Sequence, residues 1–197
     1  MDKLRERAEA FSNLLNIKYN IVLGKKGKRT DICLFFDKVH FHHLVGLQYL
    51  TDMPQLNRDR TKVFDNILND TIKFEHISNS RLFESIENRF MSFLFIEQFL
   101  DNNELVFKFK HEIGKMSKMK AKYILESAID GNTAYMCIDI DRTNNEYFGR
   151  SFFPREEIDY TLKHTKYTLL YKEKVNTITE EVIIQYDRLT PKEHLFA

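Results

Sequence analysis

The sequence predicts an α+β fold in which N-terminal helices and one β-hairpin pack on a mainly antiparallel sheet. Apolar residues recur at helical spacing through much of residues 1–100, whereas residues 101–190 show short alternating segments separated by turns. The chain has 197 residues, of which 43% are hydrophobic, and this is enough for one sizeable core. Only 6 Gly and 3 Pro argue against a long linker, so we expect residues 1–197 to form a single domain.

The helix-rich half contains a hairpin between its first two helices. We expect helices over residues 3–16, 41–50, 59–69 and 81–100, and hairpin strands over 19–23 and 31–36. Ser80 is a plausible cap for the long last helix, whose broad apolar arc predicts a central place in the core. The hairpin turn, Lys25-Lys26-Gly27-Lys28-Arg29, is strongly basic, so it is either a phosphate-contacting face or a solvated charged tip.

The second half alternates between apolar and polar residues. We expect strands over residues 105–109, 133–140, 147–153, 165–172 and 181–186. Asn144-Asn145 marks a turn between two of them, and residues 119–127 fit a strand or a helix. The pattern therefore favours a meander packed on the helices.

Composition narrows the class of protein. No apolar run is long enough to span a bilayer, and the charged N-terminus lacks the apolar core of a signal peptide. Cys33 and Cys137 lie far apart in alternating segments, which favours buried thiols in a reducing cytoplasm over a disulfide. The net charge of +1 does not by itself indicate a nucleic-acid binder, although a neutral protein can carry a local basic face.

The segment His40-Phe41-His42-His43 is the strongest candidate for chemistry, because the pKa of histidine lies nearest neutrality. A zinc site would need a second pair of ligands, and the other histidines are isolated. In a helix that starts near Phe41, His43 shares a face with Leu47 and His42 points elsewhere, so one imidazole faces a cleft while the other is solvated. His43 is then either a catalytic residue or a hydrogen-bonded packing residue.

Arg150 and Ser151 form the second candidate, on the expected strand 147–153. Strand alternation predicts that the two side chains lie on opposite faces. An arginine beside a hydroxyl can bind a phosphate oxygen and stabilise developing charge. The structural alternative is an ion pair between Arg150 and a carboxylate such as Asp141.

The run from Thr165 to Lys172 is the third candidate. Lys166 and Thr168 project from one strand face, which suits phosphate recognition. Tyr171 and Lys172, together with His42 of the histidine segment, are candidate substrate contacts. The structural alternative is a half-exposed strand. Asp139 and Asp141 could form a metal-binding pair, but turn chemistry near Asn144 is the preferred explanation. Phosphate-binding glycine loops, nucleophile elbows and zinc-protease motifs are missing from the sequence.

Several segments together resemble a known family. They are Phe41-His42-His43-Leu44-Val45-Gly46-Leu47, Phe64-Asp65-Asn66-Ile67-Leu68, Arg150-Ser151-Phe152-Phe153-Pro154, Asp159-Tyr160, and the run from Tyr167 to Asn176. On these segments most of the chain resembles the fourth branch of the phage-associated nuclease-like families of the barnase–EndoU–colicin–RelE class. The resemblance implies a barnase/EndoU/RelE-like fold encoded by phages, prophages or mobile elements, and RNA cleavage without a metal or other cofactor. It carries over His43, Arg150 and Ser151, and then Lys166, Thr168 and Tyr171.

We therefore expect a metal-independent endoribonuclease acting on RNA, tRNA included. In such an enzyme the 2′-hydroxyl of the substrate attacks the adjacent phosphate, so the protein supplies a base, an acid and cations. His43 would be the base or acid, Arg150 or Lys166 the cation, Ser151 or Thr168 the orienting hydroxyl, and Tyr171 a stacking platform. The alternatives are a non-catalytic module that binds RNA or a protein, or a structural phage accessory protein. A protein partner or inhibitor is also expected, and an enzyme requires His43, Arg150 and Lys166 to converge on one cleft.

Overall fold

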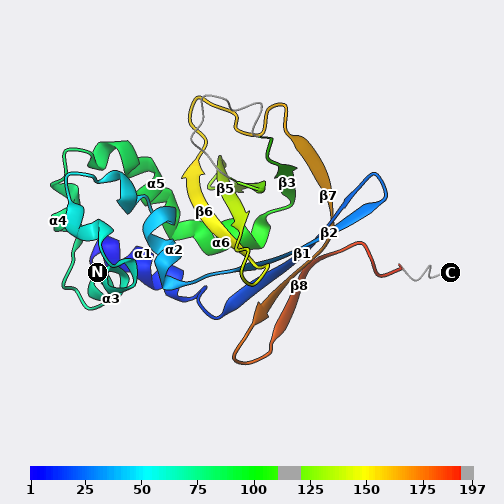
Figure 1. The fold of residues 1–197 in the computed structure, drawn as a ribbon, viewed down its shortest axis with the longest axis horizontal. Coiled ribbons are helices and arrows are strands. Elements are labelled where there is room, and N and C mark those ends of the chain that lie inside the picture. Colours follow the sequence, from blue (N-terminus) through cyan, green and yellow to red (C-terminus); the bar gives the residue numbers. More distant parts are fainter. Residues whose placement is uncertain (111–120, 192–197) are drawn as a thin grey trace.

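The computed structural model describes residues 1–110 and 121–191. The α-helices are α1 (Lys3–Ser12), α2 (Lys38–Leu44), α3 (Arg60–Leu68), α4 (Phe74–Ser78), α5 (Glu87–Ser92) and α6 (Ile96–Asn102). Helices α1 to α5 gather on one side of the molecule and the strands form a curved sheet on the other, with α6 lying among the strands (Figure 1). Short 3-10 turns are η1 (Leu47–Tyr49), η2 (Pro54–Asn57), η3 (Phe83–Ile86) and η4 (Phe93–Phe95). No helix of the described residues is long and apolar enough to cross a bilayer.

The strands form one eight-stranded sheet that closes on itself. They are β1 (Ile17–Lys25), β2 (Lys28–Phe35), β3 (Leu105–Lys108), β4 (Tyr123–Ile129), β5 (Asn132–Ile140), β6 (Tyr147–Pro154), β7 (Thr165–Asn176) and β8 (Val182–Asp187). Their order is β1-β2-β6-β5-β4-β3-β7-β8, and β7 also pairs with β1. This second pairing closes a barrel, and β8 lies outside the ring on β7.

The prediction of a mixed α+β fold is confirmed, but an open meander is not what forms. Most strand pairs are antiparallel, whereas β2 and β6 pair in parallel over Leu34 with Tyr147 and Phe35 with Phe148. The barrel arises because the long strand β7 reaches β3 at its start and β1 over the rest of its length. Alternation along a sequence shows that a strand exists but not which strands it pairs with, so the closure had no local signal.

The predicted long helix over residues 81–100 is wrong. Two 3-10 turns and two short α-helices replace it, beginning at Phe83. Ser80 nevertheless accepts a hydrogen bond from the N–H of Leu82 at 3.1 Å. A straight helix buries only one stripe, whereas here Phe90 packs on Phe74 and Phe99 packs on Phe152 of the barrel. The segmented path lets a broad apolar arc serve both neighbours.

The structure gives the end of the first helix and shows that the segment 119–127, which fitted a strand or a helix, contains a strand. Asp2 caps α1 by accepting from the N–H groups of Leu4 and Arg5. That helix ends at Ser12, four residues before the predicted end at residue 16. The segment 119–127 belongs to strand β4 from Tyr123 onward, and residues 119–120 lie outside the described residues.

Aromatic rings join the helices to the barrel in one continuous core. Phe11 of α1 is fully buried, and its ring centroid lies 5.7 Å from Phe41, 5.9 Å from Phe64 and 6.1 Å from Phe93. Phe93 in turn contacts Phe152 of β6. Helices α2 and α5 contact β6 directly, whereas α3 packs on α1 and α2, and the candidate site lies beside these elements.

Candidate functional site

Reciprocal capping at the start of α2 fixes the histidine segment. Asp37 accepts from the N–H of Val39 at 3.0 Å, and its own N–H donates to Nδ1 of His40 at 3.0 Å. His40 and His43 are three residues apart, so they lie on the same side of the helix. The Nδ1 atom of His40 accepts this hydrogen bond only when the ring is neutral, which leaves Nε2 as a donor.

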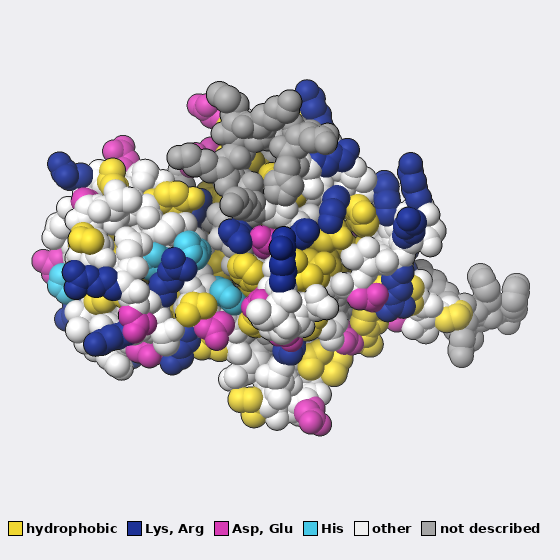
Figure 2. Space-filling view, in the orientation of Figure 1, with side chains coloured by type: hydrophobic (Ala, Val, Ile, Leu, Met, Phe, Trp, Pro, Cys, Tyr) yellow, Lys and Arg dark blue, Asp and Glu magenta, His cyan; other side chains and the backbone are white. Residues whose placement is uncertain are grey.

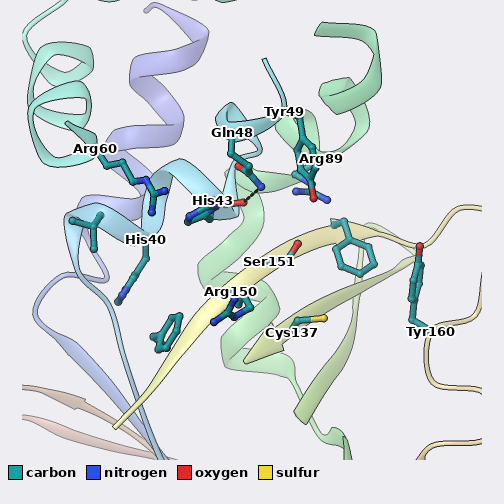
Figure 3. Close-up of a pocket in the computed structure, with 13 residues that line it drawn as sticks. His40, His43, Gln48, Tyr49, Arg60, Arg89, Cys137, Arg150, Ser151 and Tyr160 are labelled. Atoms are coloured by element: carbon teal, nitrogen blue, oxygen red, sulfur yellow. Dashed lines mark hydrogen bonds between the residues drawn. The ribbon is translucent and has the colours of Figure 1, made fainter. Parts of the chain in front are cut away.

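These two histidines face a pocket of about 720 Å³ between the helices and the barrel. Figure 2 shows histidine side chains (cyan) where the helical part meets the strands. Figure 3 shows the pocket lining, which comprises Val39, His40, His43, Gln48, Tyr49, Arg60, Arg89, Cys137, Phe148, Arg150, Ser151, Phe153 and Tyr160. Three guanidinium groups and two imidazoles therefore meet in one cavity.

A β-bulge brings Arg150 and Ser151 to the same pocket. Cys137 of β5 pairs with Ser151, but the next residue, Ile138, pairs with Gly149, so Arg150 is the extra residue. Regular alternation would put the two side chains on opposite faces, and that prediction is wrong for this reason. The ion pair expected for Arg150 forms with Asp139 at 3.1 Å rather than with Asp141.

Arg89 of α5 is a pocket residue that the sequence did not single out. Its guanidinium lies over the ring of Tyr49 at 4.8 Å and near that of Phe153 at 5.6 Å. Its Nη1 atom is buried without a hydrogen-bond partner among the described residues. The signal in the sequence was that Arg89 is the one basic residue between Leu82 and Phe107.

Gly46 allows Arg89 to approach this closely. It has φ 98°, a left-handed conformation that ends α2 and that glycine adopts without strain. A Cβ atom at Gly46 would lie 2.9 Å from Cδ of Arg89 and 3.3 Å from Cγ2 of Ile86. The glycine thus turns the chain toward η1, where Gln48 and Tyr49 join the pocket.

The pocket is electropositive and its imidazoles are neutral near pH 7. Burial, together with the positive charges of Arg60 and Arg150, lowers the pKa of His43 to about 4. Figure 3 shows Arg60 and His43 pointing toward one another from α3 and α2. Burial also lowers the pKa of His40. The thiol of Cys137 is buried and its pKa is raised to about 12, so it is not a thiolate nucleophile.

The remaining predicted residues lie elsewhere. Lys166 and Thr168 line a separate pocket of about 420 Å³ beside the hairpin tip. Tyr171 donates a hydrogen bond to Glu173 in a third pocket. Lys172 is 2% exposed, and its Nζ donates to the carbonyl oxygens of Leu100, Asp101 and Asn103, where it closes the end of α6. The expected convergence of His43 with Arg150 holds, and that with Lys166 does not.

His42 is a candidate substrate contact that does not line the pocket, and it is buried rather than solvated. Its side chain is 1% exposed, and burial lowers its pKa to about 4. Asp141 accepts from the N–H and Oγ1 of Thr143, which agrees with the preferred role in a turn. No group of three or more His, Cys, Asp or Glu side chains suited to a metal ion occurs within residues 1–110 and 121–191.

The low pKa of His42 predicts a stability that falls in acid. The unfolded chain binds a proton at His42 below about pH 6.5, whereas the folded chain binds it only near pH 4. Stability is therefore greatest above pH 6.5, and the loss on acidification toward pH 4 is on the order of 3 kcal/mol from this residue. We expect His42→Met to flatten the dependence of the urea midpoint on pH between 7 and 4.5.

The buried residue Ile67 of α3 provides the control for this measurement. Ile67→Val removes one methylene and no titratable group, so it is expected to shift the urea midpoint by a similar amount at each pH. An equal pH dependence in wild type and His42→Met would show that burial of His42 does not control acid stability.

The pocket, the bulge and the α2 segment all lie within the region matched by a family model. The model describes a phage-Barnase-EndoU-ColicinE5/D-RelE like nuclease, the fourth of that name, and it matches residues 3–189. The chain belongs to this nuclease-like family. Neither the curated proteins nor the solved structures gave a significant match. The family resemblance expected from the sequence is thus confirmed. The matched region contains every residue that lines the pocket.

Proposed function

We propose that this chain is a metal-independent endoribonuclease of phage or mobile-element origin, and that the pocket beside α2 is its active site. Membership of a nuclease-like family supports a nucleic-acid substrate. The observation that carries the proposal is the meeting of His40 and His43 with Arg60, Arg89 and Arg150 in one cavity. Guanidinium groups bind phosphate oxygens in a forked geometry, and imidazoles move protons.

The proposed reaction is internal transfer of the phosphate within RNA. His43 takes the proton from the 2′-hydroxyl, and the 2′-oxygen forms a bond to the adjacent phosphorus. The bond from phosphorus to the 5′-oxygen breaks, and the imidazolium of His43 returns its proton to that oxygen. The products are a 2′,3′-cyclic phosphate and a 5′-hydroxyl, so atoms and electrons balance without an added nucleophile.

The other pocket groups act on the phosphate. The guanidinium groups of Arg60, Arg89 and Arg150 stabilise the charge that develops on the phosphate oxygens. Arg89 is prepared for this role because its buried Nη1 has no partner in the described part of the chain. The Nε2 of His40 donates a hydrogen bond to a phosphate oxygen of the substrate, because its Nδ1 already accepts one from the N–H of Asp37.

Bound RNA also adjusts the chemistry of His43. Burial, and after it the positive charges of Arg60 and Arg150, lower the pKa of His43 to about 4, which keeps it unprotonated and ready to act as a base. A phosphate anion offsets those positive charges and raises the pKa of His43. The imidazolium formed in the reaction is thereby stabilised until it protonates the leaving oxygen. Ser151 lies in the same cavity and is placed to orient a phosphate or sugar oxygen.

The direct test is incubation of the purified protein with total RNA and with tRNA in excess EDTA. We expect discrete fragments with 2′,3′-cyclic phosphate and 5′-hydroxyl ends, because the 2′-hydroxyl is the nucleophile. An RNA in which the cleaved position carries a 2′-O-methyl group is the matched control and is expected to resist cleavage. Cleavage that occurs only with added divalent metal, or binding of RNA without cleavage, would contradict the proposal, and the latter would favour a binding module.

A further inference from the structure

A second basic surface lies at the far end of the strand that leads to the pocket. It comprises Lys25, Lys26, Lys28, Lys166 and Arg188, and we name it the hairpin-tip surface. The β1–β2 turn supplies the first three of these residues, β7 supplies Lys166, and the segment after β8 supplies Arg188. Sequence positions more than 150 residues apart therefore meet here.

Barrel closure holds this surface together. Gly24 pairs with Thr168 across β1 and β7, and the Nζ of Lys25 donates to the carbonyl oxygen of Lys166 at 2.9 Å. The strands approach closely, since a Cβ atom at Gly24 would lie 2.9 Å from Cδ1 of Leu170. The N–H of Arg188 donates to the carbonyl of Leu170 at 2.8 Å, which fixes the third segment. The charges are thus displayed on a paired scaffold rather than on a loose loop.

The positive charge of the hairpin-tip surface is not neutralised by nearby carboxylates in the described structure. Within the described residues none of its five cations forms an ion pair, whereas Arg29 next to them pairs with Asp31 at 2.7 Å. Two adjoining pockets of about 420 and 530 Å³ are lined by these cations and share Thr168. Among the described residues, Glu104 is the one carboxylate that lines either pocket. Gathered unpaired cations repel each other, and a polyanion relieves that repulsion.

The hairpin tip and the histidine pocket are connected along one strand. Strand β2 starts at Lys28 in the tip and ends at Phe35, whose ring lies 5.4 Å from that of His40. Seven steps along a strand span about 23 Å. Figure 2 shows Lys and Arg side chains (dark blue) on the same face, from the histidines across to the hairpin at the right. A span of this length corresponds to roughly eight base pairs of an A-form RNA helix.

We propose that the hairpin-tip surface binds the sugar-phosphate backbone of a structured RNA whose cleaved phosphate lies in the histidine pocket. This inference rests on the proposed function and adds to it the class of substrate, an RNA with a stem of about eight base pairs or more beside the cleavage site. Positions Lys166 and Thr168 then contribute to phosphate recognition at this surface. They act at a distance from His43 and do not enter the chemical step.

The test measures binding rather than cleavage. Every protein carries His43→Ala, so that RNA is not consumed, and the variant adds Lys26→Gln and Lys28→Gln. The probes are a labelled stem-loop with a stem of about ten base pairs and a labelled tetranucleotide, both followed by fluorescence anisotropy over a range of salt concentrations. We expect affinity for the stem-loop to fall about tenfold, and the slope of log affinity against log salt to decrease by about 2.

The matched control carries Lys3→Gln and Arg81→Gln, which remove two exposed charges from the helical side. It is expected to bind both probes as the parent does. Equal stem-loop affinity in the hairpin variant and the control would overturn the proposal, as would an equal loss for both probes. Binding to phosphatidylserine vesicles is measured for the same proteins. The proposal is also overturned if the hairpin variant loses vesicle binding but keeps its affinity for RNA. Failure of the proposed function is detected separately, as absence of cleavage by the wild-type protein in EDTA.

Discussion

Replacing His43 with alanine is expected to lower the rate of RNA cleavage by about 10²- to 10⁴-fold. His43 is the imidazole in the pocket that can accept a proton without losing a structural hydrogen bond, because the Nδ1 of His40 already accepts from Asp37. The measurement is kcat/KM on a labelled RNA oligonucleotide, with the circular dichroism spectrum and the urea midpoint as checks on folding.

Two comparisons make the His43→Ala result specific. His76→Ala removes an exposed histidine from α4 and is expected to leave kcat/KM unchanged. His43→Ala is also expected to retain RNA binding, since the three pocket arginines remain. A folded His43→Ala protein that cleaves at the wild-type rate would remove His43 from the mechanism and would shift attention to Tyr49 and Tyr160.

Arg89→Met is expected to lower kcat/KM by about 10²- to 10³-fold, the cost of removing one preorganised donor to a developing charge. Methionine keeps the apolar stem over Tyr49 and near Phe153, so the change mainly removes the guanidinium. Because the Arg89 side chain makes no hydrogen bond or ion pair within the described residues, its loss leaves no acceptor there unpaired, and we expect the fold to be kept.

Arg81→Met is the control for this variant, because Arg81 is exposed and does not line the pocket. Its kcat/KM is expected to equal that of the wild type. Arg89→Lys should recover only part of the activity, since an ammonium ion cannot make the forked contact with a phosphate. Full activity in Arg89→Met would mean that Arg89 supports the packing of Tyr49 rather than the transition state.

Local patterns in the sequence predicted the elements of the fold but not their closure. Helical spacing in α1 and α3 and alternation in the strands identified most segments, since both depend on residues close in sequence. The segmented path from Phe83 to Asn102 and the pairing of β1 with β7 depend on what each segment packs against. Those partners lie far along the chain, so no local window contains them.

Some residues of the candidate site were predicted from the sequence, and others depend on contacts between distant segments. His43 and Arg150 were predicted because an imidazole cluster and a strand arginine beside a hydroxyl are informative by themselves. Arg60 and Arg89 were missed because the sequence does not show what a helical arginine faces, although the separation of Arg89 from other basic residues was a signal. Lys166 and Thr168 were misplaced, since strand alternation gives the face of a residue but not its distance from His43.

Barrel closure has a consequence for a ribosome making this protein. His43, Arg60 and Arg89 are synthesised early, whereas Arg150 and strand β7 are synthesised late. Ile17 of β1 cannot pair with Asn176 of β7 until almost the whole chain has been made. Contacts between such distant positions form slowly, because a long loop must be closed before they stabilise anything. A nascent or truncated chain therefore lacks a complete pocket until synthesis is nearly finished.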